Sequence, residues 1–315
     1  MRILNLLARG ATPLILILLC LVIGMLQPCF MTLGNIVNVF HRSSILLIVS
    51  IGMTYVIITA GIDLSVAGTM GLAGAVFVSL AKLDAFSYIA LPMALLTGVC
   101  VGLANAFLIT KFKMAPFVVT FSTLAITRSI TWVYTGGNPI AGVPQYAIFL
   151  GRGQIGIFPP IVLLAALLFL LFDGVLSYTK FGVYTYGIGT NFEAARRAGV
   201  NTKKHLFLVY GMCGTLAAIG GVTIAARLNS AYPNAGEEYE LMAIAAVIVG
   251  GASLFGGEGN LKGTLIGVLI IEVIRNGLNL IGLNVFWHKG VLGFIIIIAV
   301  IARILTTKGM KTNKN

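Results

Sequence analysis

The sequence predicts an all-α polytopic membrane protein, and three observations favour this class. The chain of 315 residues is 58% hydrophobic and only 10% charged, whereas a soluble domain carries about 25% charged residues. Long apolar runs recur along it, separated by glycine, proline and charges. Its basic residues, which give a net charge of +12, are scattered at the ends of those runs. Because they form no continuous basic face, they indicate membrane orientation and argue against nucleic-acid binding.

Ten apolar runs approach the length of about 20 residues that a helix needs to cross the hydrocarbon. They lie at roughly 11–30, 43–61, 66–81, 87–110, 115–135, 158–177, 204–227, 239–252, 261–281 and 288–305. The third and the eighth are short and rich in glycine, which is typical of bent or broken helices buried among others. We expect the first run to be a retained span and not a signal peptide, because no small-residue cleavage site follows it.

Ten spans place both termini on one side of the membrane. Most lysines and arginines outside the spans then fall on that same side, which predicts that both termini lie in the cytoplasm. The longest outer segment, about 136–158, is too short for a domain and is interpreted as a lid or docking surface. We therefore expect residues 1–315 to form a single transmembrane domain that is energised by a partner or by an ion gradient.

A basic, alanine-rich stretch, "TYGIGTNFEAARRAGVNTKKH", follows the sixth run. Thr190 and Glu193 fit a capping box, in which each side chain accepts a hydrogen bond from a free N–H group of the other residue. The alanines that follow favour a helix, and Gly199 is a natural stop. The predicted helix, about 191–198, would be only about 12 Å long. Since it cannot cross a membrane, we expect it at the cytoplasmic surface.

Two interpretations of this helix remain open from helix physics alone. Its basic residues would suit an amphipathic helix resting on anionic lipid. Its small residues would instead let another protein approach closely. The order Glu-Ala-Ala, with a glycine four residues after the second alanine, favours the second interpretation. Under it, the residues that couple to a partner are Thr190, Asn191, Glu193, Ala194, Ala195, Arg196 and Gly199.

The segment "NFEAARRAGVN" resembles the EAA-type loop of ABC-importer permeases, which docks into a groove of the ATP-binding subunit. Three further blocks, at 54–76, 115–140 and 226–283, resemble the sugar-type permeases of that family. They contain "GIDLSV", "APFVVTFSTLAITRSITWVYTGGNPI" and "VIVGGASLFGGEGNLKG". The blocks follow the family's order from about residue 50 to 300. The resemblance implies the ABC importer permease fold, two ATP-binding subunits, a periplasmic sugar-binding protein and a second permease copy in a homodimer or related heterodimer.

Three residues depart from the family's pattern. Ala60 and Ala67 replace glycines that are usual around "IDLSV", and Met242 stands where an acidic residue is common. We expect these substitutions to alter the polarity of the pore lining, so they weaken the assignment of one particular sugar.

The stretches "AGIDLSVAGTMGLAG" and "VGGASLFGGEGNLKG" show weak internal sequence similarity to each other. With five spans in each half, the halves would run in opposite directions, which predicts the inverted 5+5 repeat that transporters use.

Polar residues within the spans are candidates for the translocation path. Glu272 and Arg275 are three apart on one helix face, so we expect them to form a buried structural pair. Arg128 lies on a stripe of serines and threonines in the fifth span. The candidate path residues are Asn105, Thr127, Asn276 and Asn279.

A second group of residues has a structural interpretation. Asp63 and Ser65 suit the start of the third span as helix caps, worth about 1 kcal/mol, and this reading is favoured over a proton relay. The stretch "GGASLFGGEGN" lacks the GK[ST] of a phosphate-binding loop, so tight turns and close helix approach explain its glycines better. These structural residues are Gly61, Asp63, Ser65, Gly250, Gly251, Gly256 and Gly257.

The sequence thus predicts the permease subunit of an ATP-driven importer for a monosaccharide. A permease for nucleosides or branched-chain amino acids is the alternative within the family, and a gradient-driven carrier is the alternative from another class. The three histidines have no ligand spacing, and no catalytic set is present, so we expect no metal, cofactor or enzyme activity. Charges expected on the outer rim to meet the binding protein are Lys82, Arg152, Arg227, Glu237 and Glu238.

Overall fold

Each predicted apolar run forms a helix in the computed structural model, which describes residues 2–284 and 286–312. The ten helices that match the runs are α1 (Arg2–Leu26), α2 (Leu33–Ile58), α3 (Val66–Ala81), α4 (Ala90–Phe112), α5 (Pro116–Thr135), α7 (Pro160–Tyr178), α10 (Thr202–Leu228), α11 (Tyr239–Val249), α12 (Leu261–Leu280) and α13 (Phe286–Thr312). The shorter elements are η1 (Pro28–Met31), η2 (Asp84–Ile89), β1 (Ile140–Ala141), α6 (Gln145–Arg152), α8 (Lys180–Thr190), α9 (Phe192–Arg197) and β2 (Ser230–Ala231).

Six of the described helices are long and apolar enough to cross a membrane. They are α2, α5, α7, α10, α12 and the combined segment Ala85–Phe112 that contains α4. Four further helices are apolar but shorter in their described apolar part: Thr12–Leu26, Val66–Ala81, Tyr239–Val249 and Phe286–Ile298. The all-α polytopic class is therefore confirmed. The count of ten spans and the inverted repeat stay predictions.

The predicted start of the second span is wrong, because α2 begins at Leu33 and not near residue 43. The polar residues that suggested a boundary are satisfied by partners inside the fold. Asn35 exchanges hydrogen bonds with Asn276, and Asn38 accepts one from Arg227 at 3.0 Å. The His41 Nε2 atom lies 2.8 Å from the Gly151 carbonyl oxygen. A buried polar group with a partner does not end a helix.

The centre of the molecule is formed by α2 and α10. Every residue of α2 from Ser43 to Ile58 is buried, and α10 packs against α2, α3 and α4. Small residues allow the closest of these contacts. A side chain at Gly98 or Gly214 would collide with the backbone of the facing helix. In contrast, α7 exposes large apolar side chains such as Leu167 and Leu170, as expected for a helix that faces lipid or another subunit.

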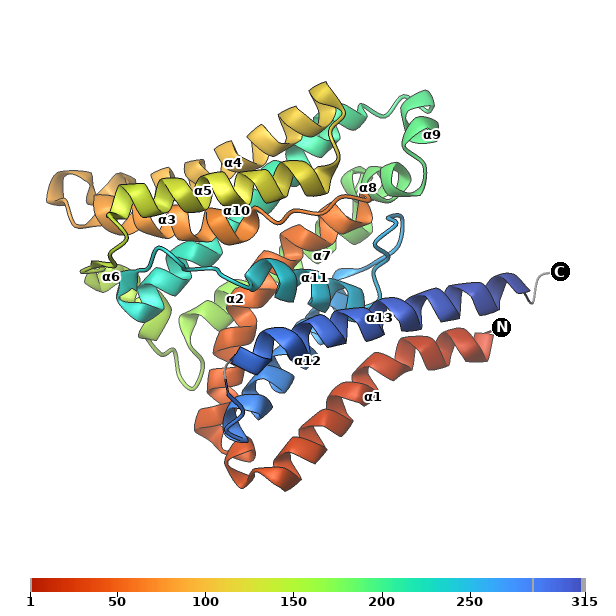
Figure 1. Ribbon diagram of the computed structural model, residues 1–315, viewed down its shortest axis with the longest axis horizontal. Helices are drawn as coiled ribbons and strands as arrows, with labels where there is room; N and C mark the ends of the chain where they lie inside the picture. The colour runs from red at the N-terminus through yellow and green to blue at the C-terminus, as the bar shows by residue number, and fades with distance from the viewer. Residues whose placement is uncertain (1, 285, 313–315) are drawn as a thin grey trace.

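Figure 1 shows α3, α4, α5 and α10 on one side of the molecule and α1, α12 and α13 on the other, with α2 crossing between them. The start of α1, the end of α13 and α9 lie at the same end (Figure 1), whereas α6 lies at the opposite end. This placement is the one expected if the termini and the short basic helix share one side of the membrane.

The two predicted outer segments are joined to each other. Ile140 pairs with Ala231 and Ala141 with Ser230, so β1 and β2 form an antiparallel two-stranded sheet. The Val143 amide also donates to the Asn229 side chain at 3.2 Å. The segment 136–158 is thus attached to the segment that leads into α11.

Candidate functional site

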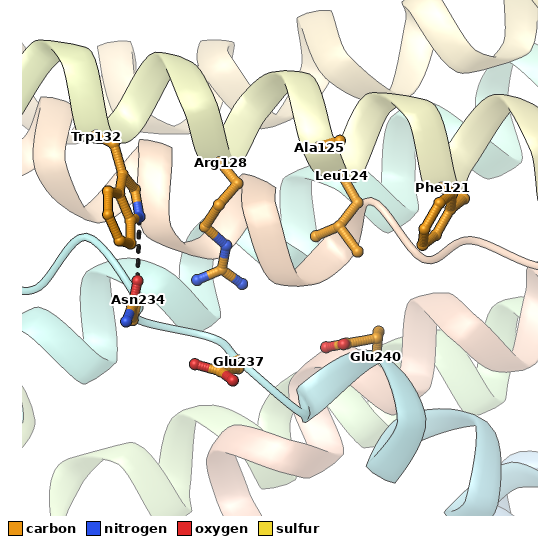
Figure 2. A pocket seen from close by; sticks show the side chains of 8 residues that line it. All are labelled: Phe121, Leu124, Ala125, Arg128, Trp132, Asn234, Glu237 and Glu240. Carbon is orange, nitrogen blue, oxygen red and sulfur yellow. Dashed lines mark hydrogen bonds between the residues drawn. The ribbon is translucent and has the colours of Figure 1, made fainter.

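A groove of about 470 Å³ lies between α5 and the segment that enters α11. In Figure 2 the side chains from α5 point across it toward those of the facing segment. The residues that line it are Phe121, Leu124, Ala125, Arg128, Trp132, Asn234, Glu237 and Glu240.

The α5 side of the groove is one helical stripe. From Phe121 to Trp132, each member has another member three or four residues away, so they project from the same face. At 1.5 Å per residue this stripe is about 16 Å long, roughly half the thickness of the hydrocarbon. The opposite side of α5, with Val119 and Thr127, is buried and faces α3. The helix is therefore anchored along one face and open along another.

The chemistry of the groove combines aromatic faces with hydrogen-bonding groups. Trp132 Nε1 donates to the Asn234 side chain at 3.1 Å, and Arg128 Nη1 donates to the Pro233 carbonyl at 3.4 Å. Figure 2 shows Arg128 reaching from α5 toward Glu237 and Glu240. The buried Oε2 atom of Glu240 has no hydrogen-bond partner among the described residues. Such a surface suits a small polar ligand that has both apolar faces and hydroxyl or charged groups.

None of the four predicted path residues lines this groove. Asn105 is buried, donates to Ser65 Oγ at 2.8 Å and accepts from Thr123 Oγ1 at 2.7 Å. Thr127 donates to the Thr123 carbonyl of its own helix and faces α3.

On α12, Asn276 exchanges hydrogen bonds of 3.0 and 2.8 Å with Asn35, and the exposed Asn279 donates to the Arg275 carbonyl. The structure therefore separates the four residues into three locations. Phe121, Trp132 and Asn234 were not predicted from the sequence, although the helical spacing of the two aromatics on α5 indicates that they share one face.

The predicted charge pair on α12 is confirmed. Glu272 Oε1 lies 3.9 Å from Arg275 Nη1, and the Glu272 side chain is buried. The prediction that Arg227 is an exposed rim charge is wrong, because its guanidinium is half-buried and donates to Asn38. Glu237 and Glu238 are paired within the chain, with Lys289 Nζ at 2.9 and 3.4 Å.

Asp63 orders the turn before α3, but the predicted helix-cap role of Asp63 and Ser65 is wrong, because neither side chain accepts from an N–H group of the first helical turn. Its Oδ1 atom accepts hydrogen bonds from the backbone N–H of Ser65 at 3.0 Å and from the Ser65 hydroxyl at 2.6 Å. Ser65 is the N-cap position, but its own side chain makes no capping bond. Burial raises the pKa of the Asp63 carboxyl, and the two bonds from Ser65 partly offset this. Through Ser65 the turn is connected to Asn105 and then to Thr123 on α5.

The predicted short helix exists as α9, but its predicted capping box is wrong. Asn191, not Thr190, is the N-cap, and its side chain accepts from the Ala194 amide at 2.9 Å. Thr190 ends α8, where its hydroxyl donates to the Tyr186 carbonyl. Glu193 pairs with Arg196 at 2.7 Å instead of reaching back. An asparagine at this position satisfies the same free N–H groups, which explains why the helix still begins here.

The end of α9 follows the prediction. Gly199 has a φ of +86°, its amide donates to the Arg196 carbonyl, and Val200 N–H donates to the Ala195 carbonyl, which is a Schellman motif. The two alanines differ, because Ala194 is exposed whereas Ala195 is only 8% exposed and buried against this chain. Ala195 is therefore not available for direct contact with another protein, contrary to the sequence-based expectation.

The glycine-rich segment 250–260 packs against the end of α8 and the end of α2. Gly257 N–H donates to the Ile58 carbonyl at 2.8 Å, and Tyr186 donates to the Gly259 carbonyl at 2.7 Å. A Cβ at Gly257 would lie 2.6 Å from Thr190 Oγ1. The stretches around "GIDLS", "FEAAR" and "GGASLFGGEGN", which are distant in sequence, meet at this one junction.

The predicted roles of the glycines in turns and close contacts are confirmed. Gly251, Gly256 and Gly257 all have positive φ angles, at +98°, +81° and +75°. Gly250 lies where α11 approaches Gly263 of α12 too closely for a side chain, and Gly61 lies against the Tyr210 hydroxyl. Among the described residues, no group of three His, Cys, Asp or Glu side chains could hold a metal ion.

Comparison with known proteins assigns the family. A family model described as the permease component of branched-chain amino acid transport systems matches residues 35–300. The chain belongs to the permease family of ABC importers. Ribose import permease RbsC of Escherichia coli K12 is 38% identical over 91% of this chain and 90% of its own length, and RbsC of Bacillus subtilis 168 is 41% identical over 91% and 89%. Galactose/methyl galactoside import permease MglC of Haemophilus influenzae is 35% identical over 94% of each chain. No solved structure matches the chain.

Membership of this family makes the chain a multi-pass transport permease and not an enzyme. It also implies an ATP-binding partner and a substrate-binding partner. The three departures from the family's sequence pattern do not change the polarity of the groove, because none of them lines it. Ala60 is exposed at the α2 end, Ala67 is buried, and Met242 is buried with its sulfur 3.5 Å from Arg275 Nη1.

Proposed function

We propose that this chain is the membrane-spanning permease subunit of an ATP-driven, binding-protein-dependent importer that moves a monosaccharide across the bacterial inner membrane by alternating access. The observation that carries the proposal is the similarity to ribose and galactoside permeases along about nine-tenths of the chain. Residues 1–315 act as one transmembrane domain, with α9 and both termini in the cytoplasm, and ATP is hydrolysed by a separate subunit.

The groove beside α5 contributes to the translocation path in this proposal. Phe121 and Trp132 offer aromatic faces to the C–H surface of a sugar ring, and Arg128, Asn234 and Glu240 offer partners to its hydroxyls. A second permease copy, in a homodimer or a related heterodimer, closes the open side of the groove. The substrate-binding protein docks at the opposite end from α9, where α6 and the β1–β2 sheet lie.

One observation favours a second candidate, a permease for branched-chain amino acids. Arg128 and Glu240 place opposite charges on one groove, where they could receive the carboxylate and ammonium groups of an amino acid. The description of the family model points the same way. The sugar is preferred because the ribose and galactoside permeases are 35–41% identical to this chain along about nine-tenths of its length.

Transport measurements distinguish these candidates. The permease, its ATP-binding subunits and its binding protein are reconstituted in proteoliposomes, and uptake of labelled ribose, galactose, leucine and uridine is compared. We expect ATP-dependent uptake of one of the two sugars that persists when ionophores collapse all ion gradients. Uptake of leucine or uridine alone would replace the sugar assignment. Uptake that requires a gradient and no ATP would indicate a secondary carrier.

A second experiment tests α9 as the coupling helix. Because Ala194 is exposed and Ala195 is not, the informative substitution is Ala194→Trp. We expect it to reduce retention of the ATP-binding subunit during purification, by overpacking worth about 1–3 kcal/mol. The double variant Arg196→Ala with Arg197→Ala tests the alternative, in which α9 rests on lipid. Full retention and normal uptake with Ala194→Trp, together with reduced uptake by the arginine variant in bilayers that contain anionic lipid, would replace coupling by lipid contact.

A further inference from the structure

The segment 250–260 presents a large apolar side chain at the same end of the molecule as α9. Phe255 lies at the tip of this segment and is 82% exposed. Its neighbours Ser253, Glu258 and Asn260 are polar, and α12 begins only at Leu261. In Figure 1 this connection between α11 and α12 projects toward α8.

The tip of the segment is held in one conformation by backbone hydrogen bonds. Ser253 N–H donates to the Glu258 carbonyl at 3.1 Å, and Gly256 N–H donates to the Ser253 carbonyl at 3.0 Å. Phe255 N–H donates to the Ser253 hydroxyl at 3.2 Å. Phe255 is therefore held outward by an ordered turn. Because the backbone that carries Phe255 is ordered before binding, less conformational entropy is lost on association, which favours Phe255 as an interface anchor.

The size of α9 shows that a partner docked there needs additional surface. A stable interface buries about 800 Å² on each partner and involves about 20–30 residues of each. The helix α9 contains six residues, one of which, Ala195, is buried against this chain. The segment 250–260 is continuous with it, because Gly257 packs on Thr190 directly before the cap of α9.

We propose that the segment 250–260 is a second contact surface for the ATP-binding subunit, with Phe255 inserted into that subunit beside α9. This inference rests on the proposed function. The ATP-binding subunit would then have an aliphatic or aromatic pocket for Phe255, next to the groove that binds α9. Because both surfaces are fixed to the end of α2 through Ile58 and Gly189, movement of the ATP-binding subunit displaces them together.

Site-specific photocrosslinking tests this surface in the assembled complex. A benzophenone-bearing phenylalanine analogue replaces Phe255 in one variant, Ala194 in a second and Phe286 in a third. Phe286 is an 89% exposed phenylalanine at the start of α13, away from the end that carries α9, and serves as the matched control. We expect crosslinks to the ATP-binding subunit from positions 194 and 255 and none from position 286.

The outcomes separate the inference from the proposed function. Crosslinks to that subunit from position 194 but only to lipid from position 255 would overturn the inference and leave the coupling assignment in place. Crosslinks from neither position would overturn the coupling assignment itself. As a quantitative check, Phe255→Ala should weaken binding of the purified ATP-binding subunit about tenfold, whereas Phe286→Ala should leave it unchanged. Equal affinities for both variants would also reject Phe255 as an anchor.

Discussion

The groove beside α5 is open, whereas the junction around Thr190, where α8 and the segment 250–260 meet the end of α2, is tightly packed. The groove keeps about 470 Å³ open and is lined by aromatic and charged side chains. At the junction, α8 and the segment 250–260 approach the end of α2 so closely that backbone touches backbone at Gly189 and Gly257. The groove leaves space around its side chains, whereas Gly189 and Gly257 at the junction leave no space for a side chain. Substitutions should therefore affect transport at the groove and folding at the junction.

The two regions are physically connected. The end of α2 continues into the turn at Asp63, which is bonded to Ser65. Ser65 is bonded to Asn105, and Asn105 to Thr123 on α5. Thr120 of α5 also donates to the Ile62 carbonyl at 3.1 Å. A rigid junction joined to a helix with one open face is an arrangement that can convert movement at α9 into movement of the groove wall.

The largest expected effect is at the junction. In Gly189→Ala the new methyl group would collide with the Ile58 carbonyl and lie 2.5 Å from the Gly257 nitrogen. Because neither backbone atom can move alone, we expect a loss of stability on the order of 3 kcal/mol. Thermal unfolding in detergent and abundance in the membrane measure it.

Gly187→Ala on the same helix is the matched control. No atom lies within 4 Å of a Cβ at this position. Alanine is the better helix former, so we expect stability to rise by about 0.5–1 kcal/mol. If both variants unfolded at the same temperature, the close packing of the junction would be contradicted.

The next effect belongs to the groove. Arg128→Gln keeps a polar side chain but removes the charge that crosses toward Glu237 and Glu240. We expect uptake to fall at least tenfold, which corresponds to about 1.4 kcal/mol, while the unfolding temperature stays nearly unchanged. Ser122→Ala is the control, because the Ser122 hydroxyl donates only to the Val118 carbonyl of α5. Normal uptake by Arg128→Gln would exclude this side of α5 from the path.

How much the sequence predicts differs between these two regions. Apolar length and composition locate the helices well, and α3 occupies 66–81 as expected. Gly199 was predictable as the end of α9 because a positive φ angle is a local property. Both successes depend on neighbours within a few residues along the chain.

The site required contacts that local patterns do not encode. Asn276 was expected in the path, yet it is satisfied by Asn35, 241 positions away in sequence. The groove exists only because α5 lies opposite residues 234–240. A polar side chain within a span signals that it has a partner, but sequence alone does not say whether the partner is substrate or protein.

A smaller effect distinguishes the two residues at the start of α9. Asn191→Ala removes the bond to the Ala194 amide and should destabilise the helix by about 1 kcal/mol. Thr190→Val should change little, because the Thr190 hydroxyl bonds only to its own helix at Tyr186. Amide hydrogen exchange over residues 191–198 should become about fivefold faster in the first variant and remain unchanged in the second. The reverse order would restore Thr190 as the cap.

The smallest effect concerns Ala60, which connects α2 to the turn at Asp63. This exposed alanine has a φ of +63°, a conformation that costs a non-glycine residue about 1–2 kcal/mol. Glycine removes that strain but makes the unfolded chain more flexible, which offsets about 0.4–1 kcal/mol. We therefore expect Ala60→Gly to raise stability by roughly 0.5 kcal/mol.

Ala104→Gly, in the exposed face of α4, is the matched control and should lower stability by up to about 1 kcal/mol. Opposite shifts of the unfolding temperature in the two variants would support a strained but rigid connection at Ala60. A decrease in both would show that the connection is relaxed, and the junction would then be less rigid than its packing indicates.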